Sequence, residues 1–289
     1  NTRSNGIRTL HEAQGTATLE SGWSFPVGPL GELTAAAEIR ARALVPAAAA
    51  LERDARGAPA VASLAAALAG GRTVAVIAEL KRRSPSKGSI NETLDVRGRA
   101  VEYAAAGAAA LSVLTEPARF GGSLDDLRAV HGAVELPLLR KDFIVDRLQL
   151  LEARAAGASA VLLIARALAP GRRAALAAEA FALGLDVLME VRSEAELDLA
   201  LRVERAVIGI NNRNLETLAI DDSVSARLLP LVPAHRTVVY ESGVTSRAHV
   251  ERAAALGADA VLVGSSLSSA GDGGAAAALL AGVPRCARG

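Results

Sequence analysis

Residues 74–81 read VAVIAELK, a short apolar run that carries a carboxylate at Glu79 and ends in the ammonium of Lys81. A run this short and this rich in apolar side chains is typical of a strand that is buried on both faces. Seven further runs of the same kind lie at residues 110–114, 136–140, 160–165, 186–191, 206–211, 237–241 and 260–264. Helix-like stretches rich in Ala, Leu, Glu and Arg separate them, and this alternation indicates a parallel sheet built from βαβ units.

A repeated junction supports this interpretation. The chain reads AGAAAL at residues 106–111, AGASAV at 156–161 and LGADAV at 256–261, with a shorter version, LGLDV, at 183–187. In each copy we expect a helix to end at the glycine, which adopts the left-handed conformation easily, and a buried strand to follow. Eight strands in a chain of this size match a barrel. An open doubly wound sheet is the main alternative, but it usually has fewer strands, and no G-x-G-x-x-G turn follows any strand here. We therefore predict an α/β fold, a (β/α)8 TIM barrel with an N-terminal helical extension.

The N-terminal part of the chain has a different pattern. Residues 1–22 are polar and rich in Gly and Thr, and we expect them to be poorly ordered. Residues 34–56 predict a helix, with Thr34 as a candidate N-cap and a break at Pro46. Residues 61–69 predict a second, short helix. We take residues 1–70 as an extension, helical from about residue 34, that packs on a barrel domain of residues 71–289.

Composition restricts the classes of function. The net charge of +1 gives no reason to expect nucleic acid or an anionic membrane as a partner. Cys286 is the single cysteine, so no disulfide framework forms within the chain, and residues 1–22 lack the apolar segment of a signal peptide. No apolar stretch is long enough to cross a bilayer, and the four histidines show no metal-ligand spacing. We expect a cytoplasmic protein without a metal.

Lysine is rare in this chain. Of 32 cationic side chains only Lys81, Lys87 and Lys141 are lysines, and the others are arginines. A guanidinium cannot be deprotonated in proteins, whereas the pKa of an ammonium can be shifted into a working range. Because Lys81 and Lys141 end apolar strand-like runs, we infer that protons are transferred at these two positions. Chance is the alternative explanation.

Polar side chains concentrate where the predicted strands end, which is the face at which barrel enzymes hold their active sites. Glu79 and Lys81 are two residues apart on one strand, so their side chains leave on the same face and can pair. A structural ion pair is the alternative role for them. Lys141 and Glu190 form a second set from two other strands. Two such sets imply proton transfers at two points on one substrate.

Short turns of small residues follow the last two predicted strands. They are Ser242-Gly243 and Gly264-Ser265-Ser266. Their backbone N–H groups are suited to binding one anion, and phosphate sites in barrels often lie after these two strands. We therefore expect a phosphorylated small-molecule substrate.

The segment that begins at Glu79 resembles the signature of a known family. Residues 79–88, ELKRRSPSKG, resemble the E-x-K-x-x-S-P-S-x-G signature of the indole-3-glycerol-phosphate synthase family. Further segments follow in the family's order: SVLTE at 112–116 with FGGS at 120–123, LRKDFIV at 139–145, EAR at 152–154, EV at 190–191, GINNRNL at 209–215, ESG at 241–243 and VGSSL at 263–267. The resemblance runs from about residue 74 to residue 267.

The resemblance implies an activity in tryptophan biosynthesis. The reaction is ring closure of 1-(2-carboxyphenylamino)-1-deoxyribulose 5-phosphate to indole-3-glycerol phosphate, with loss of CO₂ and water and without a cofactor. By this resemblance Lys141 is a general acid toward the ketone oxygen, while Glu190 and the Glu79–Lys81 pair are candidates for dehydration. We also expect a monomer or a weak homo-oligomer, with other tryptophan-pathway enzymes as candidate partners.

Further site residues follow from the same resemblance. Asn211 and Ser242 would orient substrate hydroxyls or the carboxylate, and Glu241 would support this polar network. The groups implied to hold the phosphate are Ser84, Gly243, Gly264 and Ser265, with Arg213 on the anionic side. Phe120 and Phe143 would pack on the aromatic ring.

The chain departs from the family pattern at Arg192, where a small polar residue or His is more usual, and at Tyr240, where the family has a small residue. We expect Tyr240 to point away from Glu241 because neighbouring strand residues face opposite sides.

Two other functions are possible for a barrel of this kind. An isomerase of the phosphoribosylanthranilate type is expected to use a Cys/Asp or paired-Asp arrangement, which is absent from the strand ends. A non-catalytic binding barrel would not need the Lys and Glu set.

Overall fold

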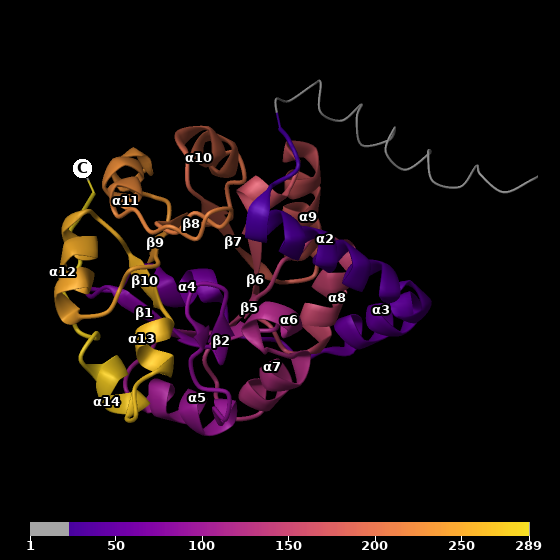
Figure 1. Ribbon diagram of the computed structural model, residues 1–289, viewed down its shortest axis with the longest axis horizontal. Coiled ribbons are helices and arrows are strands. Elements are labelled where there is room, and N and C mark those ends of the chain that lie inside the picture. The colour runs from indigo at the N-terminus through magenta and orange to yellow at the C-terminus, as the bar shows by residue number, and fades with distance from the viewer. Residues whose placement is uncertain (1–22, 289) are drawn as a thin grey trace, which may run out of the picture.

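The computed structural model describes residues 23–288, so the prediction for residues 1–22 lies outside the described residues. Eight parallel strands close into a barrel in the order β1-β4-β5-β6-β7-β8-β9-β10, with β10 pairing back to β1. Figure 1 shows the strands at the centre and the helices around them. The strands are β1 (Ala75–Leu80), β4 (Ala110–Leu114), β5 (Leu138–Lys141), β6 (Ala160–Ile164), β7 (Asp186–Val191), β8 (Val207–Asn211), β9 (Val238–Glu241) and β10 (Ala260–Val263). The predicted fold class is confirmed.

Helices follow the strands around the barrel. The longer ones are α5 (Val96–Ala105), α7 (Leu124–His131), α8 (Arg147–Ala155), α9 (Pro170–Ala182), α10 (Glu194–Leu201), α11 (Ser223–Leu228), α12 (Arg247–Ala255) and α14 (Gly273–Ala278). Shorter pieces lie in the loops: α6 (Pro117–Phe120), α13 (Ser265–Ser268), the 3-10 turns η2 (Ala165–Ala167) and η3 (Leu229–Leu231), and a small hairpin of β2 (Arg83–Ser84) and β3 (Gly88–Ser89).

The predicted glycine junctions form as expected. Gly107, Gly157 and Gly257 have φ of 88–89° and Gly184 has φ of 76°. After each glycine, the next backbone N–H donates back to a carbonyl five residues earlier, as from Ala108 to Tyr103 at 3.1 Å. This is the hydrogen bond of a Schellman motif, which satisfies a carbonyl at the helix end and turns the chain toward the next strand.

The apolar core has two parts. One cluster lies between the strands and the surrounding helices and includes Val76, Ala78 and Tyr103. The other fills the inside of the barrel and includes Ile77 and Val239. Neighbouring residues of β1 therefore alternate between the two clusters, which explains why the strands are apolar on both faces.

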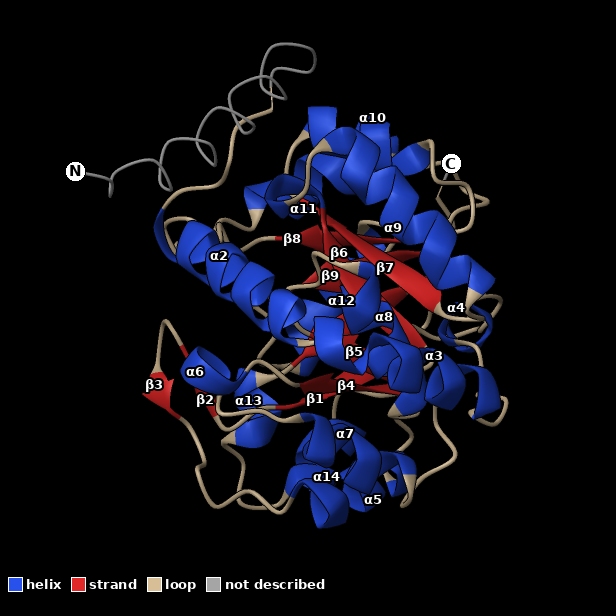
Figure 2. Ribbon diagram, turned by 90° about the vertical axis from the view of Figure 1, so that its right-hand side faces the viewer, coloured by secondary structure: helices blue, strands red, loops and turns tan. Residues whose placement is uncertain are grey.

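The segment before β1 covers both ends of the barrel. Its helices are α2 (Gly28–Ala43), α3 (Ala48–Gly57) and α4 (Leu64–Leu68), with the 3-10 turn η1 (Val45–Ala47) between the first two. Figure 2 shows α2 and α4 at opposite ends of the strands. Leu30 of α2 and Leu64 of α4 belong to the same interior cluster, because each closes the barrel from its own side.

The first helix begins earlier than predicted. It starts at Gly28, six residues before Thr34, with Pro29 in its first turn, a position that proline favours. Thr34 is therefore not an N-cap. It lies inside the helix, and its hydroxyl donates to the carbonyl of Leu30 at 2.7 Å. The predicted break at Pro46 is confirmed by the turn η1.

Within residues 23–288, no helix is long and apolar enough to cross a membrane.

Candidate active site

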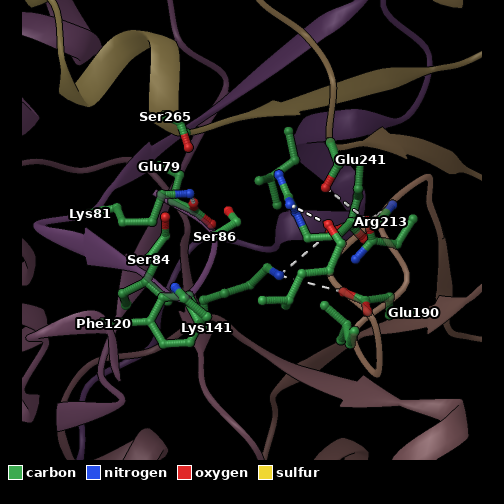
Figure 3. Close-up of a pocket in the computed structure, with 18 of the residues that line it drawn as sticks. Glu79, Lys81, Ser84, Ser86, Phe120, Lys141, Glu190, Arg213, Glu241 and Ser265 are labelled. Atoms are coloured by element: carbon green, nitrogen blue, oxygen red, sulfur yellow. Dashed lines mark hydrogen bonds and ion pairs between the residues drawn. The ribbon is translucent and has the colours of Figure 1, made fainter. Parts of the chain in front are cut away.

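A cavity opens at the carboxyl ends of the barrel strands. Figure 3 shows ten of its residues labelled, with polar side chains converging on its centre. All fourteen site residues predicted from the sequence line this cavity. They are Glu79, Lys81, Ser84, Phe120, Lys141, Phe143, Glu190, Asn211, Arg213, Glu241, Ser242, Gly243, Gly264 and Ser265.

Glu79 of β1 and Lys81, which directly follows that strand, form an ion pair. Lys81 Nζ lies 2.6 Å from Glu79 Oε1, and the Ser112 hydroxyl donates to Glu79 Oε2 at 3.3 Å. Burial alone would raise the pKa of the Glu79 carboxyl, but Lys81 and Lys141 outweigh burial and hold that pKa below its usual value. The Glu79 carboxylate therefore stays ionised in the barrel.

Lys141 lies between two carboxylates from β7 and β9. Its Nζ is 3.5 Å from Glu190 Oε2 and 3.6 Å from Glu241 Oε2. Burial alone would lower the pKa of the Lys141 ammonium, but Glu190, Glu241 and Glu79 raise it above its ordinary value. Lys141 is therefore protonated near neutral pH.

Glu241 is the most buried of the carboxylates in the cavity, with 1% of its surface exposed. Burial, together with the nearby Glu190 and Glu79 carboxylates, raises its pKa to about 8 although Lys141 opposes the shift. Its Oε1 is buried and accepts no hydrogen bond. The sequence predicted Glu241 as support for a polar network, but it did not predict the direct contact with Lys141.

Asn211 and Ser242 both line the cavity and are linked by a hydrogen bond. Asn211 Oδ1 accepts hydrogen bonds from the Ser242 hydroxyl at 2.8 Å and from the Arg213 backbone N–H at 2.9 Å. Ser242 has φ of 67°, a conformation that is costly for a residue other than glycine and is frequent at functional sites. Gly243 follows with φ of 85°, so the chain turns sharply beside the cavity.

Four of the predicted anion-binding groups line the cavity from three loops, and Arg213 lines it from the loop after β8. Gly243 and the segment Gly264-Ser265 line it after β9 and β10, and Ser84 lines it from the β2–β3 hairpin. Ser84 Oγ accepts the Lys87 backbone N–H at 3.2 Å, which closes the tip of the hairpin. Lys87, the third lysine, also lines the cavity, although it was not among the predicted site residues.

Another part of the wall is apolar. The rings of Phe120 and Phe143 have centroids 6.3 Å apart. The sequence did not predict the apolar residues that complete this wall: Pro29, Leu30, Leu33, Leu162, Ile164, Leu215, Leu218 and Leu262. Nothing in their local pattern distinguishes them from core residues, and only the position of α2 over the barrel brings Leu30 and Leu33 to the cavity.

Asp142, next to Lys141, organises the loop after β5. Its carboxylate accepts hydrogen bonds from Thr115 Oγ1 at 2.7 Å and from the Phe143 backbone N–H at 2.8 Å. It also accepts from Arg140 at 3.1 Å and from Arg40 of α2 at 2.6 Å. The sequence placed Asp142 at a strand end but not among the site residues. The structure shows that it fixes the chain on both sides of itself.

Comparison with known proteins decides the family. A family model described as Indole-3-glycerol phosphate synthase matches residues 33–280. The chain belongs to the indole-3-glycerol phosphate synthase family. The indole-3-glycerol phosphate synthase of Paenarthrobacter aurescens (strain TC1) is 49% identical over 236 residues, covering 80% of this chain and 86% of the relative. The corresponding protein of Nocardioides sp. is 52% identical over 208 residues, covering 72% and 80%.

Solved structures of lower identity share the fold with this member of the indole-3-glycerol phosphate synthase family. A 3-hexulose-6-phosphate synthase from Salmonella typhimurium has a TM-score of 0.57 at 16% identity and covers 72% of this chain and 96% of its own. A tryptophan synthase alpha chain from Legionella pneumophila has a TM-score of 0.54 at 15% identity, covering 72% and 89%. At such identities the likeness shows a shared barrel fold alone.

Tyr240 and Arg192, which depart from the indole-3-glycerol phosphate synthase pattern, lie outside the main cavity. Tyr240 packs in the cluster between strands and helices, as predicted from its alternation with Glu241. Arg192 lines a smaller neighbouring cavity, and its Nε is buried without a hydrogen-bond partner. Neither residue displaces a predicted catalytic group.

Proposed function

We propose that this chain is a lyase of tryptophan biosynthesis that converts 1-(2-carboxyphenylamino)-1-deoxyribulose 5-phosphate to indole-3-glycerol phosphate, CO₂ and water. The observation that carries the proposal is the position of Lys141, whose ammonium is held between Glu190 and Glu241 in the cavity. The family relation supplies the reaction, and the cavity offers a group for each part of the substrate.

The cavity fits a molecule with an anionic end and an aromatic end. We assign the phosphate to the turns at Gly243 and Gly264-Ser265, with Ser84 of the hairpin completing that side. We assign the aromatic ring of the substrate to the wall that contains Phe120 and Phe143. Aromatic rings pack favourably against one another in tilted or edge contacts. This orientation leaves the ketone of the substrate near the charged centre.

Ring closure begins when the aryl carbon that bears the carboxylate attacks the ketone carbon. A carbon–carbon bond forms, the C=O π bond breaks, and Lys141 Nζ donates a proton to the oxygen, which becomes a hydroxyl. The aryl carbon then loses its carboxylate as CO₂. The electrons of the broken carbon–carbon bond return to the ring and restore its aromaticity.

Dehydration completes the indole. The new hydroxyl leaves as water after it accepts a proton, and a base removes one proton from the ring side, so that the step is balanced. Glu190 and the Lys81–Glu79 pair are the groups that we assign to these two transfers. Asn211 and Ser242, joined by their hydrogen bond, orient the substrate's hydroxyls.

A direct assay tests the proposal. The purified chain is supplied with 1-(2-carboxyphenylamino)-1-deoxyribulose 5-phosphate, and the fluorescence of the indole product is followed. Product formation supports the proposal, and no product at high enzyme concentration overturns it. Phosphoribosylanthranilate is assayed in parallel, because turnover of that substrate instead would favour an isomerase. We further expect a monomer or a weak homo-oligomer, which sedimentation velocity measures.

A further inference from the structure

Gly209 interrupts an apolar strand at a position where the backbone does not need glycine. It lies in the middle of β8, is buried, and pairs in register with Glu190 of β7 and Val239 of β9. Its φ is not positive, so any residue tolerates this conformation. Glycine weakens a strand interior and often marks the close approach of another group.

The group that approaches Gly209 is the carboxylate of Glu241. A Cβ added at Gly209 would lie 2.1 Å from Glu241 Oε1 and 3.3 Å from its Cδ, far closer than real Cβ contacts allow. It would also lie 3.2 Å from Leu188 Cδ1. The space that a side chain would fill on β8 is therefore occupied by Glu241, which reaches across from β9. The other carboxylate oxygen, Oε2, is the one that lies 3.6 Å from Lys141 Nζ.

The same arrangement occurs once more in the barrel. A Cβ added at Gly264 would lie 2.2 Å from Glu79 Oε1 and 2.8 Å from Lys81 Nζ. Each of these two buried carboxylates thus lies over a glycine of the neighbouring strand or strand end. Gly264 also belongs to the turn assigned to the phosphate, so Gly209 is the position at which this arrangement can be tested separately.

We propose that Gly209 is a positioning residue for Glu241: the absence of a side chain there sets where the Glu241 carboxylate lies relative to Lys141. This inference rests on the proposed function, in which Lys141 donates a proton during ring closure. Gly209 does not line the cavity, and its effect passes through Glu241.

The variant Gly209→Ala tests the inference. The clash falls on the end of a side chain and not on backbone, so we expect the variant to fold with the Glu241 carboxylate displaced. Misplacing a catalytic group by about 1 Å can lower the rate by about 100-fold. We expect kcat to fall at least ~10-fold and KM to stay within ~3-fold, because the assigned phosphate and ring contacts are unchanged.

A double variant separates positioning from general packing. Aspartate is shorter than glutamate by one methylene, so Glu241→Asp removes the overlap with a Cβ at position 209. In the Glu241→Asp background we expect Gly209→Ala to lower kcat by less than ~2-fold, since coupled residues are not additive. Equal losses in both backgrounds would overturn the proposal. Gly171→Ala on α9 is the control, because a Cβ there meets nothing within 4 Å.

A crystal structure of Gly209→Ala provides a readout that does not depend on activity. We expect the Glu241 carboxylate to have moved by about 1 Å or more. A carboxylate in its original position would contradict the proposal whatever the kinetics. Failure of the proposed function has a different signature, the absence of indole product from the unmodified chain.

Discussion

Lys141 Nζ lies 3.6 Å from Glu241 Oε2, and the surroundings favour the protonated form of both groups. The pKa of Lys141 is raised chiefly because Glu190 and other carboxylates outweigh the effect of burial. The pKa of Glu241 is raised to about 8 because it is buried and lies near Glu190 and Glu79. Near neutral pH Lys141 and most of the Glu241 carboxyl groups are therefore protonated.

Lys141→Arg should retain substrate binding and lose most turnover. Arginine keeps the positive charge between the two carboxylates but cannot release a proton. We expect kcat to fall by about 10²- to 10⁴-fold with a small change in KM. Steady-state kinetics by indole fluorescence measures both values. Near-normal kcat in Lys141→Arg would refute the acid role.

Glu241→Gln should change how stability depends on pH. The pKa of Glu241 is raised in the folded chain, so between about pH 4.5 and pH 8 the folded state holds a proton that the unfolded state has lost. This group therefore lowers stability as pH rises through that window, by at most about 1.4 kcal/mol per pH unit. The free energy of unfolding of Glu241→Gln, relative to that of the parent chain, should therefore increase as the pH rises from 5 to 8.

Urea unfolding at pH 5, 6.5 and 8 measures this difference. Only the difference between the two proteins is informative, because it cancels the contributions of groups that titrate in both. The pKa of Glu79 is lowered, so the stability that Glu79 contributes is complete above its unfolded pKa and does not change between pH 5 and pH 8. A difference that stays constant over the range would show that the pKa of Glu241 is not raised.

Lys81→Met should destabilise the barrel. It leaves the Glu79 carboxylate buried without its partner at 2.6 Å, and breaking a buried pair in this way costs about 3–5 kcal/mol. The double variant Glu79→Gln/Lys81→Met should recover much of that loss, because no isolated charge remains. Urea unfolding measures both proteins. A loss below about 1 kcal/mol in the single variant would mean that Glu79 finds another partner or water.

Phe120→Leu should weaken binding of the aromatic end of the substrate only. Aromatic contacts contribute about 0.5–1.5 kcal/mol beyond burial, so KM should rise about 2- to 12-fold. Competition by inorganic phosphate should be unchanged, because the turns at Gly243 and Gly264 are untouched. Weaker phosphate binding, or an unchanged KM, would contradict the assignment of the ring to this wall.

Arg40→Gln tests our proposal that the segment before β1 acts as an extension of the barrel domain. Arg40 lies 2.6 Å from Asp142 and 3.6 Å from Glu116, both of which are buried. Its loss should lower the free energy of unfolding by about 1–2 kcal/mol. The control is Arg42→Gln, at an exposed arginine that forms no ion pair with any residue between 23 and 288, and should change stability by less than about 0.5 kcal/mol. Equal effects of the two would argue against the proposal.

Local sequence patterns are enough to predict the elements of the barrel and the residue types of its site. Eight apolar runs and the glycine junctions at Gly107, Gly157 and Gly257 are local patterns, because helix ends and buried strands are specified by neighbouring residues. The sequence also shows that Lys and Glu concentrate at strand ends. Because parallel strands end on the same side, strand direction alone predicts that these residues share one face of the barrel.

Which of these groups are in contact depends on how the strands and helices pack. Closure of the sheet and the register between β8 and β9 bring Glu241 over Gly209 and within 3.6 Å of Lys141. The packing of α2 across the barrel mouth adds Leu30 and Leu33 to the cavity wall. These distances join residues far apart in the chain, and strand register and barrel closure, which set them, are not encoded in any local pattern.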